Sequence, residues 1–172
     1  MLKPYGIIKN IFSDATLQEW YDIFMKIPTI TKTEDGDNCW GLDINSRFYS
    51  WFQKKMMPHI QEHLGKDLKL IFCSYIDSKH PLPIHDDLKK LPNGAIGSHA
   101  FSILIPYSVE NAKDSFSKVG TCFYDKDKKI IENLAWDKGS MVWWKSSTLH
   151  SSSDFVKEGV KSKQYFVAHT YV

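Results

Sequence analysis

A histidine and an aspartate lie two residues apart in the segment His85-Asp86-Asp87. In an extended chain, residues i and i+2 project to the same side of the backbone, so the His85 imidazole and the Asp87 carboxylate would face one point. Transition metals accept both groups as ligands, and a third ligand would have to come from elsewhere in the chain. Asp86 is the alternative carboxylate if the segment is not extended. The segment also fits a polar loop, because two prolines precede it.

The other histidines are the first place to look for that third ligand. His59 and His63 are four residues apart on a predicted helix, a spacing that can bind zinc, but His59 is not followed by the glutamate of the zinc-protease motif. Solvated helix histidines are therefore the better interpretation of this pair. His80 is expected to line the mouth of a pocket. His99 opens a predicted strand and is an alternative ligand, or a residue that faces substrate or solvent.

His150 is a further candidate for the third ligand. Together with His85 and Asp87 it gives two histidines and one carboxylate, which on one face of an iron(II) ion leave three coordination positions open. This is the ligand set of non-haem iron oxygenases, in which a cosubstrate and dioxygen bind the same metal. His150 follows two predicted strands far along the chain, so the fold must return the chain to the HxD segment.

The first third of the chain is predicted to be helical. A helix is expected to begin at Ser13 or Asp14, either of which can cap it, and to end before Pro28. Residues 31–38 are polar and are predicted to form a loop.

A second helix is predicted to begin near Asn45 or Ser46. Pro58 should kink or split it, and Gly65 is the expected C-terminal cap.

From residue 67 onward the chain is predicted to be mainly β. Short segments rich in β-branched and aromatic residues alternate with turn-forming clusters, at residues 68–76, 99–106, 120–124, 129–136, 140–144 and 164–172. Helices first and strands afterwards predict an α+β chain, with helices packed on one face of a sandwich or barrel. We expect a single domain, residues 1–172, with helical support in 1–66 and a β core in 67–172.

Length and composition limit the function classes. The chain has 172 residues, 42% of them hydrophobic, and a net charge of +2, which excludes a disordered chain and weighs against nucleic-acid and membrane-surface binding. The three cysteines form no CxxC pair, so a reducing, cytoplasmic setting is expected. The oligomeric state stays open. Of the 22 basic residues, 21 are lysines, and the only arginine is Arg47.

The order of these segments resembles the Fe(II)/2-oxoglutarate-dependent oxygenase superfamily, and within it the prolyl-4-hydroxylase-like branch. The family pattern of HxD, a distal histidine and a basic residue shortly after it is similar to His85, Asp87, His150 and Lys161 in this sequence. Lys163, which has the same strand parity as Lys161, is the reserve candidate. The resemblance covers about residues 68–172 and implies a double-stranded β-helix (jelly-roll) core.

The resemblance also implies the cofactors Fe(II), 2-oxoglutarate and dioxygen. The implied reaction hydroxylates a peptidyl residue, such as a prolyl residue, or a small metabolite, and it releases succinate and carbon dioxide. The far carboxylate of 2-oxoglutarate is buried and needs a cation. Since Arg47 lies outside the matching segment, Lys161 would have to supply that cation, unless it is a solvated turn residue.

Two hydroxyl groups are further candidates for contact with 2-oxoglutarate. Tyr75 lies ten residues before His85 on a predicted strand, where a buried structural tyrosine is an equally good interpretation. Ser102, on the strand after the HxD segment, is the weaker candidate.

Two other function classes stay open. One is a non-catalytic β-sandwich that binds carbohydrate or protein and needs no metal. The other is a cupin-type metalloenzyme that does not use 2-oxoglutarate. Only the oxygenase interpretation requires a buried cation at Lys161.

Overall fold

Two antiparallel β-sheets form the body of the protein in the computed structural model, which describes residues 3–27, 30–41, 46–90, 96–97, 101–110 and 115–172. In order across the larger sheet, the strands are β1 (Tyr5–Ile8), β10 (Met141–Trp144), β7 (Phe101–Glu110), β12 (Ser162–Tyr171), β4 (Lys69–Ser78), β3 (Asn38–Trp40) and β2 (Ile30–Lys32). The smaller sheet contains β11 (His150–Ser152), β8 (Gly120–Tyr124) and β9 (Ile130–Ala135). The predicted jelly-roll core with helices on one face is confirmed.

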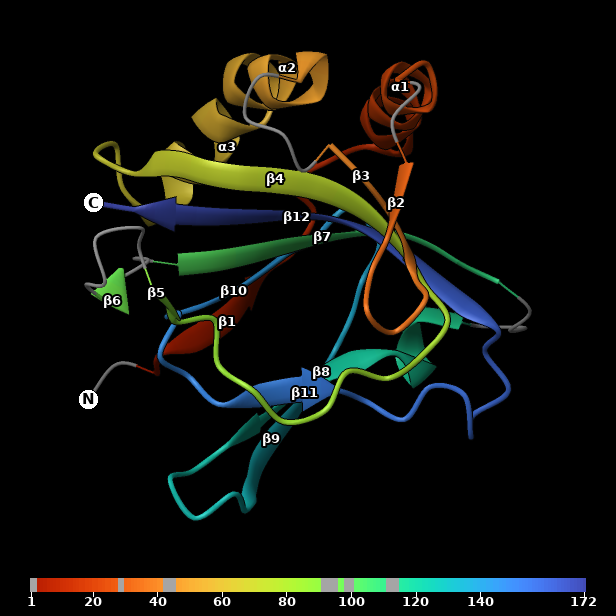
Figure 1. Ribbon diagram of the computed structural model, residues 1–172, viewed down its shortest axis with the longest axis vertical. Helices are drawn as coiled ribbons and strands as arrows, with labels where there is room; N and C mark the ends of the chain where they lie inside the picture. The colour runs from red at the N-terminus through yellow and green to blue at the C-terminus, as the bar shows by residue number, and fades with distance from the viewer. Residues whose placement is uncertain (1–2, 28–29, 42–45, 91–95, 98–100, 111–114) are drawn as a thin grey trace.

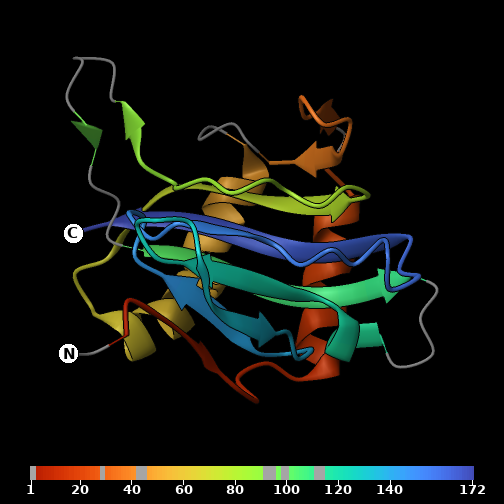
Figure 2. The same ribbon diagram turned by 90° about the horizontal axis from the view of Figure 1, so that it is seen from below.

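The helices cover one face of the larger sheet, and the smaller sheet lies on the other side (Figure 1). Seen from below, the smaller sheet crosses the larger one, and a short hairpin of β5 (Lys89–Lys90) and β6 (Ile96–Gly97) projects from the body (Figure 2). A 3-10 helix, Ser115–Lys118, follows β7. The body therefore has three layers, and the two sheets enclose the space in which the candidate site lies.

The helices begin and end close to the predicted residues. Ser13 caps α1 (Asp14–Met25), and its hydroxyl accepts a hydrogen bond of 3.1 Å from the Thr16 amide. The second predicted helix is split into α2 (Arg47–Lys55) and α3 (Met57–Leu64). Pro58 lies in the first turn of α3, where its missing N–H costs no helical hydrogen bond. Within the described residues, no helix is both long and apolar enough to cross a membrane.

The first third of the chain also contributes strands, which the sequence did not predict. β1, β2 and β3 add to the two edges of the larger sheet, and β2 and β3 form a hairpin where a loop was expected at residues 31–38. All three residues of β2 are exposed, so the hairpin lacks the apolar alternation by which strands are recognised. Its register is set instead by hydrogen bonding of β3 to β4, a contact between distant parts of the chain.

The central strand β12 divides its side chains between two environments. Phe166 and Ala168 pack in the core between the larger sheet and the helices, where Trp20 and Phe24 also lie. The odd-numbered residues of β12 project from the opposite face, towards the smaller sheet. This alternation brings the residues of one strand to the candidate site.

Candidate metal centre and its cavity

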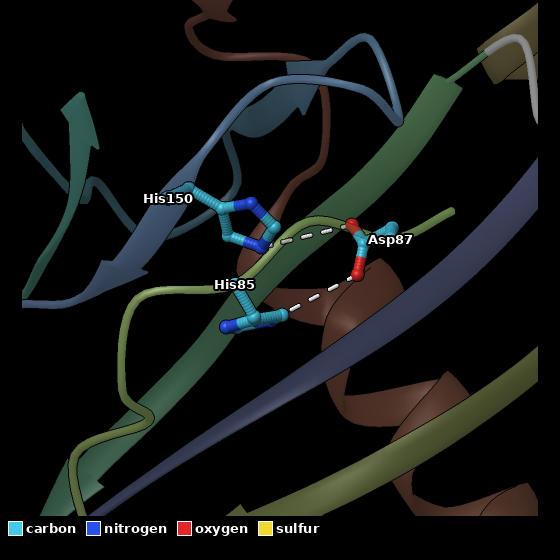
Figure 3. Close-up of side chains that lie close together, drawn as sticks. All are labelled: His85, Asp87 and His150. Carbon is cyan, nitrogen blue, oxygen red and sulfur yellow. Dashed lines mark ion pairs between the residues drawn. The ribbon is translucent and has the colours of Figure 1, made fainter. Parts of the chain in front are cut away.

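Three side chains with metal-binding atoms converge in the space between the sheets. Nε2 of His85 lies 3.9 Å from Oδ1 of Asp87, and Nε2 of His150 lies 3.6 Å from Oδ2 of the same carboxylate (Figure 3). The candidate ligand atoms of the three residues all lie within 4.8 Å of one another. The structure thus brings together the three residues that the sequence selected as a ligand set.

Backbone pairing fixes the two halves of this cluster. His85 and His150 form an isolated antiparallel bridge, in which each amide donates to the other residue's carbonyl at 2.9 Å. The amide of Asp87 donates to the carbonyl of Ser146, also at 2.9 Å. The HxD segment is therefore extended beside β11, and the His85 and Asp87 side chains face the same side, as the spacing predicts.

The hydrogen bonds of the two histidines set the tautomer that a metal requires. Nδ1 of His85 lies 2.7 Å from the carbonyl oxygen of Pro83, and Nδ1 of His150 lies 2.9 Å from that of Thr148. A carbonyl can only accept, so each Nδ1 carries a proton and Nε2 is the nitrogen left to bind a metal. Burial lowers the pKa of His150, despite the nearby Asp87 carboxylate, and this favours the neutral ligand form.

Asp87 is held as a carboxylate. Burial alone would raise its pKa, but electrostatic interactions with His169 and His150 and hydrogen bonds from Ser102 and Trp144 lower it overall. The Trp144 indole Nε1–H donates to Oδ2 at 2.7 Å. The site therefore offers two imidazole nitrogens and one carboxylate, a donor set that fits iron(II) and other divalent transition metals. The outer hydrogen bonds orient these ligands.

A cavity of about 250 Å³ extends from the cluster between the two sheets. Its walls are largely apolar, and they include Ile76, Leu104, Trp136, Trp144 and Val167. His85, Asp87 and His150 line it, and Lys163 is the only lysine among the described residues that does so.

Lys163 is fully buried in this wall, with 2% of its surface exposed. Its ammonium donates a 2.7 Å hydrogen bond to Oγ of Ser152, which lies two residues after His150 on β11. Three aromatic rings surround Nζ, with centroids at 4.5 Å (Trp136), 4.9 Å (Phe155) and 5.5 Å (Tyr165). Among the described residues, no carboxylate forms an ion pair with it. The Lys163 amino group therefore faces the cavity without a partner anion among the residues that the structure describes.

Sequence comparison adds nothing to this geometry, since no family model and no curated protein sequence matches the chain. Solved structures do match. A 2OG-Fe(II) oxygenase family oxidoreductase from Burkholderia pseudomallei superposes with a TM-score of 0.69 at 9% identity, over 98% of this chain and 84% of that one. The fold is that of the 2OG-Fe(II) oxygenases.

Two further neighbours of this oxygenase fold were solved with ligands. The viral collagen prolyl hydroxylase of Paramecium bursaria Chlorella virus-1, in a 2OG complex, has a TM-score of 0.64 at 13% identity and covers 99% of this chain and 97% of that one. HygX from Streptomyces hygroscopicus, with nickel, 2-oxoglutarate and hygromycin B bound, has a TM-score of 0.65 at 8% identity, over 98% and 83%. The chain therefore spans most of the length of these oxygenases.

Within this oxygenase fold, the expected buried cation is not Lys161. Lys161 is exposed and lies one residue before β12, where its amide donates to the carbonyl of Glu110 at 3.1 Å. The expectation of a buried cation at Lys161 is wrong because the extended strand begins only at Ser162. Lys163, the reserve candidate, is the lysine that enters the cavity.

Tyr75 does not reach the cavity either. On β4, Ser74 and Ile76 line the cavity, so Tyr75 points to the opposite face. There it packs in the helix-side core, and its hydroxyl donates to Oε1 of Gln164 at 3.4 Å. Its burial is structural, which was the competing interpretation of this residue.

Ser102 is buried beside the metal cluster rather than in the cavity wall. Its hydroxyl lies 3.1 Å from Nδ1 of His169. His169 lines the cavity and was missed by the sequence analysis. His169 and Lys163 lie an even number of residues apart on β12 and so face the same side of the strand. This spacing could have identified His169 as a cavity residue.

The alternative ligands lie elsewhere. Asp86 is exposed and accepts a hydrogen bond from the Leu88 amide at 3.2 Å. His59, His63 and His80 are exposed and do not belong to the cluster. His99 falls outside the described residues.

Proposed function

We propose that this protein is an Fe(II)- and 2-oxoglutarate-dependent dioxygenase whose iron ligands are His85, Asp87 and His150. The observation that carries the proposal is the pairing of two groups in one cavity: a converging His-Asp-His donor set and the buried, anion-free ammonium of Lys163. The first fits a divalent metal and the second fits the far carboxylate of a 2-oxo dicarboxylic acid. A metalloenzyme without this cosubstrate would not need a buried lysine in the cavity.

The metal ligands and the cavity walls would have separate roles in the proposed reaction. His85 and His150 would donate Nε2 and Asp87 its carboxylate, all held in place by the hydrogen bonds described above. When bound, iron, 2-oxoglutarate and dioxygen supply the oxidising chemistry, in which the cosubstrate becomes succinate and carbon dioxide and the substrate is hydroxylated. The apolar walls of the cavity exclude water from this reaction.

Lys163 would bind the cosubstrate as a point charge. A dicarboxylate that enters the cavity supplies the anion that the buried ammonium lacks, and this compensates the desolvation of both groups. The Ser152 hydroxyl and the rings of Trp136, Phe155 and Tyr165 hold Nζ in one position, so little side-chain entropy is lost on binding.

As substrate we propose a peptidyl residue, with prolyl residues among the candidates, or a small metabolite. The exposed apolar side chains of Ile84 and Leu88 flank the HxD ligands and would contact the substrate at the site of reaction. Both substrate classes are compatible with a cavity whose metal end is bordered by exposed residues.

The decisive experiment is an anaerobic titration of the protein with Fe(II) and then 2-oxoglutarate. We expect a weak metal-to-ligand charge-transfer band in the visible range in the wild-type protein, and no band in His150→Ala. The same variant should form no succinate when air is admitted.

The outcome separates the proposal from its two rivals. Metal binding without the band at saturating 2-oxoglutarate would contradict the proposal in favour of a cupin-type metalloenzyme. Absence of any metal binding would favour a non-catalytic module.

A further inference from the structure

One side of the cavity is formed by β4 and by the β2–β3 hairpin beside it. Phe72, Ser74 and Ile76 are alternate residues of β4 and face the cavity together. Cys39 of β3 and Thr33, which follows β2, continue the same surface. These five residues form the β4 wall, and none of them has a side chain that is charged at neutral pH.

Ser74 is a buried polar group of the β4 wall that lacks a hydrogen bond. The residue is completely buried, and its Oγ has no hydrogen-bond partner among the described residues. Ser74 lowers the pKa of the Cys39 thiol, but sulfur is only a weak hydrogen-bonding group. A buried hydroxyl without a partner costs free energy, and a ligand atom in the cavity that hydrogen-bonds to it would remove this cost.

The register of the larger sheet places Ser74 close to the metal end of the cavity. Trp144, which donates to Asp87, and His169 belong to one row of residues across β10, β7 and β12. Ser74 pairs with Val167, two residues before His169 on β12. Ser74 therefore lies about 6.8 Å from that row along the strands, and a group bound to it would lie beside the metal site.

The proposed cosubstrate would occupy a different side of the cavity. It would extend from the metal to the ammonium of Lys163, which donates a hydrogen bond to Ser152. His150 and Ser152 both line the cavity from β11, in the smaller sheet, whereas β4 belongs to the larger sheet. The β4 wall would thus be left for a second ligand.

We propose that the β4 wall binds the substrate, and that it accepts an uncharged, largely apolar group with a hydrogen-bonding atom for Ser74. Phe72 and Ile76 would contact the apolar part of this group. A charged group would lose its water here without gaining an opposite charge from the wall, which is unfavourable. This inference rests on the proposed function, since it assigns the substrate of the same site.

The test uses two probes that differ in charge, the N-acetyl amides of norleucine and of lysine. Their side chains share a four-carbon chain, and only the lysine chain ends in an ammonium. The protein is loaded with 2-oxoglutarate and with Mn²⁺ in place of iron(II), so that no turnover occurs. Mn²⁺ broadens the proton NMR signals of a probe that binds beside it, and titration of this broadening gives the dissociation constant.

We expect the norleucine probe to bind at least about tenfold more tightly than the lysine probe. Ser74→Val should weaken binding of the norleucine probe by about three- to tenfold, the usual effect of losing one hydrogen bond. Ser74→Thr is the matched control, because it has the shape of valine and keeps the hydroxyl, and it should bind like the wild type. Ser74→Ala, which adds no atoms to the cavity, should bind like Ser74→Val. None of these variants should change the affinity for 2-oxoglutarate.

Thermal unfolding of the ligand-free protein gives a second measurement. Ser74→Ala should unfold at a temperature no lower than the wild type, because it removes no hydrogen bond of the folded chain. Ser78→Ala is the comparison, since Ser78 is an equally buried residue of β4 whose hydroxyl donates to Asp37 at 2.7 Å. Its unfolding temperature should fall by about 2–4 °C. An equal fall in Ser74→Ala would show a structural role for Ser74 and overturn the inference.

The binding results distinguish failure of this inference from failure of the proposed function. Protein that binds Mn²⁺ and 2-oxoglutarate but neither probe, or both probes equally, would overturn the inference alone. Equal probe affinities in Ser74→Val and Ser74→Thr would do the same, and so would a loss of 2-oxoglutarate affinity in Ser74→Ala, which would assign Ser74 to the cosubstrate. Wild-type protein that binds no Mn²⁺ or no 2-oxoglutarate would overturn both proposals.

Discussion

The indole of Trp144 donates its hydrogen bond, 2.7 Å long, to the same Asp87 oxygen that lies 3.6 Å from Nε2 of His150. Oδ2 of Asp87 therefore lies between a tryptophan of the cavity wall and His150, a candidate metal ligand. The rings of Trp144 and His150 are also in contact, with centroids 4.6 Å apart. This arrangement connects the packing between the sheets to the geometry of the metal site.

Replacement of Trp144 by phenylalanine removes the donor and keeps an aromatic ring. We expect Trp144→Phe to weaken Mn²⁺ binding by about tenfold, because Oδ2 of Asp87 loses the group that orients it. Calorimetric titration measures the affinity. Trp143→Phe is the matched control, since Trp143 is the preceding residue of β10 and packs against the helix-side core. Equal affinities in the two variants would contradict the prediction.

Lys163 and Lys161 give a second matched pair. Lys163→Met should reduce 2-oxoglutarate affinity by about tenfold to a hundredfold, the usual cost of losing a hydrogen bond to a charged group. Mn²⁺ affinity should not change. Lys161→Met should leave both affinities unchanged, because Lys161 is exposed. Quenching of tryptophan fluorescence by 2-oxoglutarate provides the measurement. Loss of 2-oxoglutarate affinity in Lys161→Met but not in Lys163→Met would assign cosubstrate binding to Lys161 instead.

The binding of 2-oxoglutarate should depend on pH through Lys163. Burial lowers the pKa of Lys163 to about 7, although the charges of Asp37 and Cys122 act in the opposite direction. Only the ammonium form binds a carboxylate, and this form is present below that pKa and lost as pH rises. The apparent Kd should therefore increase with pH above about 7, by up to tenfold per unit.

The control for this dependence is Lys163→Arg, whose guanidinium stays charged over the whole range. Titrations of the Mn²⁺-loaded protein between about pH 6.5 and 8.5 compare the two proteins. We expect a rising Kd for the wild type and a flatter profile for the arginine variant. Identical profiles would show that another group is responsible.

Gly139 sets the turn that leads into β10. Its φ is 75°, and a Cβ at this position would lie 2.3 Å from the carbonyl oxygen of Phe12. Its own carbonyl accepts the amides of Ile11 and Phe12 at 3.0 Å. Gly139→Ala should lower the free energy of unfolding by about 2 kcal/mol or more, since left-handed strain and a backbone clash act together.

Gly159→Ala separates these two causes. Gly159 has a similar φ of 82°, but a Cβ there would meet nothing within 4 Å. The free energy of unfolding of this variant should therefore fall by only about 1 kcal/mol. Urea denaturation of both variants measures these free energies. Equal decreases in the two variants would exclude the clash with Phe12 as a cause.

Local spacing selected His85 and Asp87, whereas His150 was selected by the resemblance to the oxygenase family pattern. His85 and Asp87 fall on one side of an extended segment, and His150 lies beside them because β11 pairs with that segment. The strands of the core were also predictable from their β-branched and aromatic residues. The spacing of His85 and Asp87 and the composition of the strands depend only on residues close together in the sequence.

The remaining features depend on contacts between distant parts of the chain. Which face of β4 carries Tyr75 is decided by helices that pack there, and the periodicity of the strand itself is the same in either orientation. Lys161 and Lys163 have equal parity, and only the start of β12 at Ser162 separates an exposed residue from a buried one. The β2–β3 hairpin depends on its pairing with β4 in the same way.

The alternation along β12 makes the chemistry sensitive to the number of residues in this strand. A one-residue deletion near its start would exchange the two faces, turning Phe166 and Ala168 into the cavity and moving Lys163 and His169 out of it. β12 is hydrogen-bonded to β4 on one side and to β7 on the other, and both ladders oppose such a slip. The residue count of β12 therefore determines which of its side chains line the cavity.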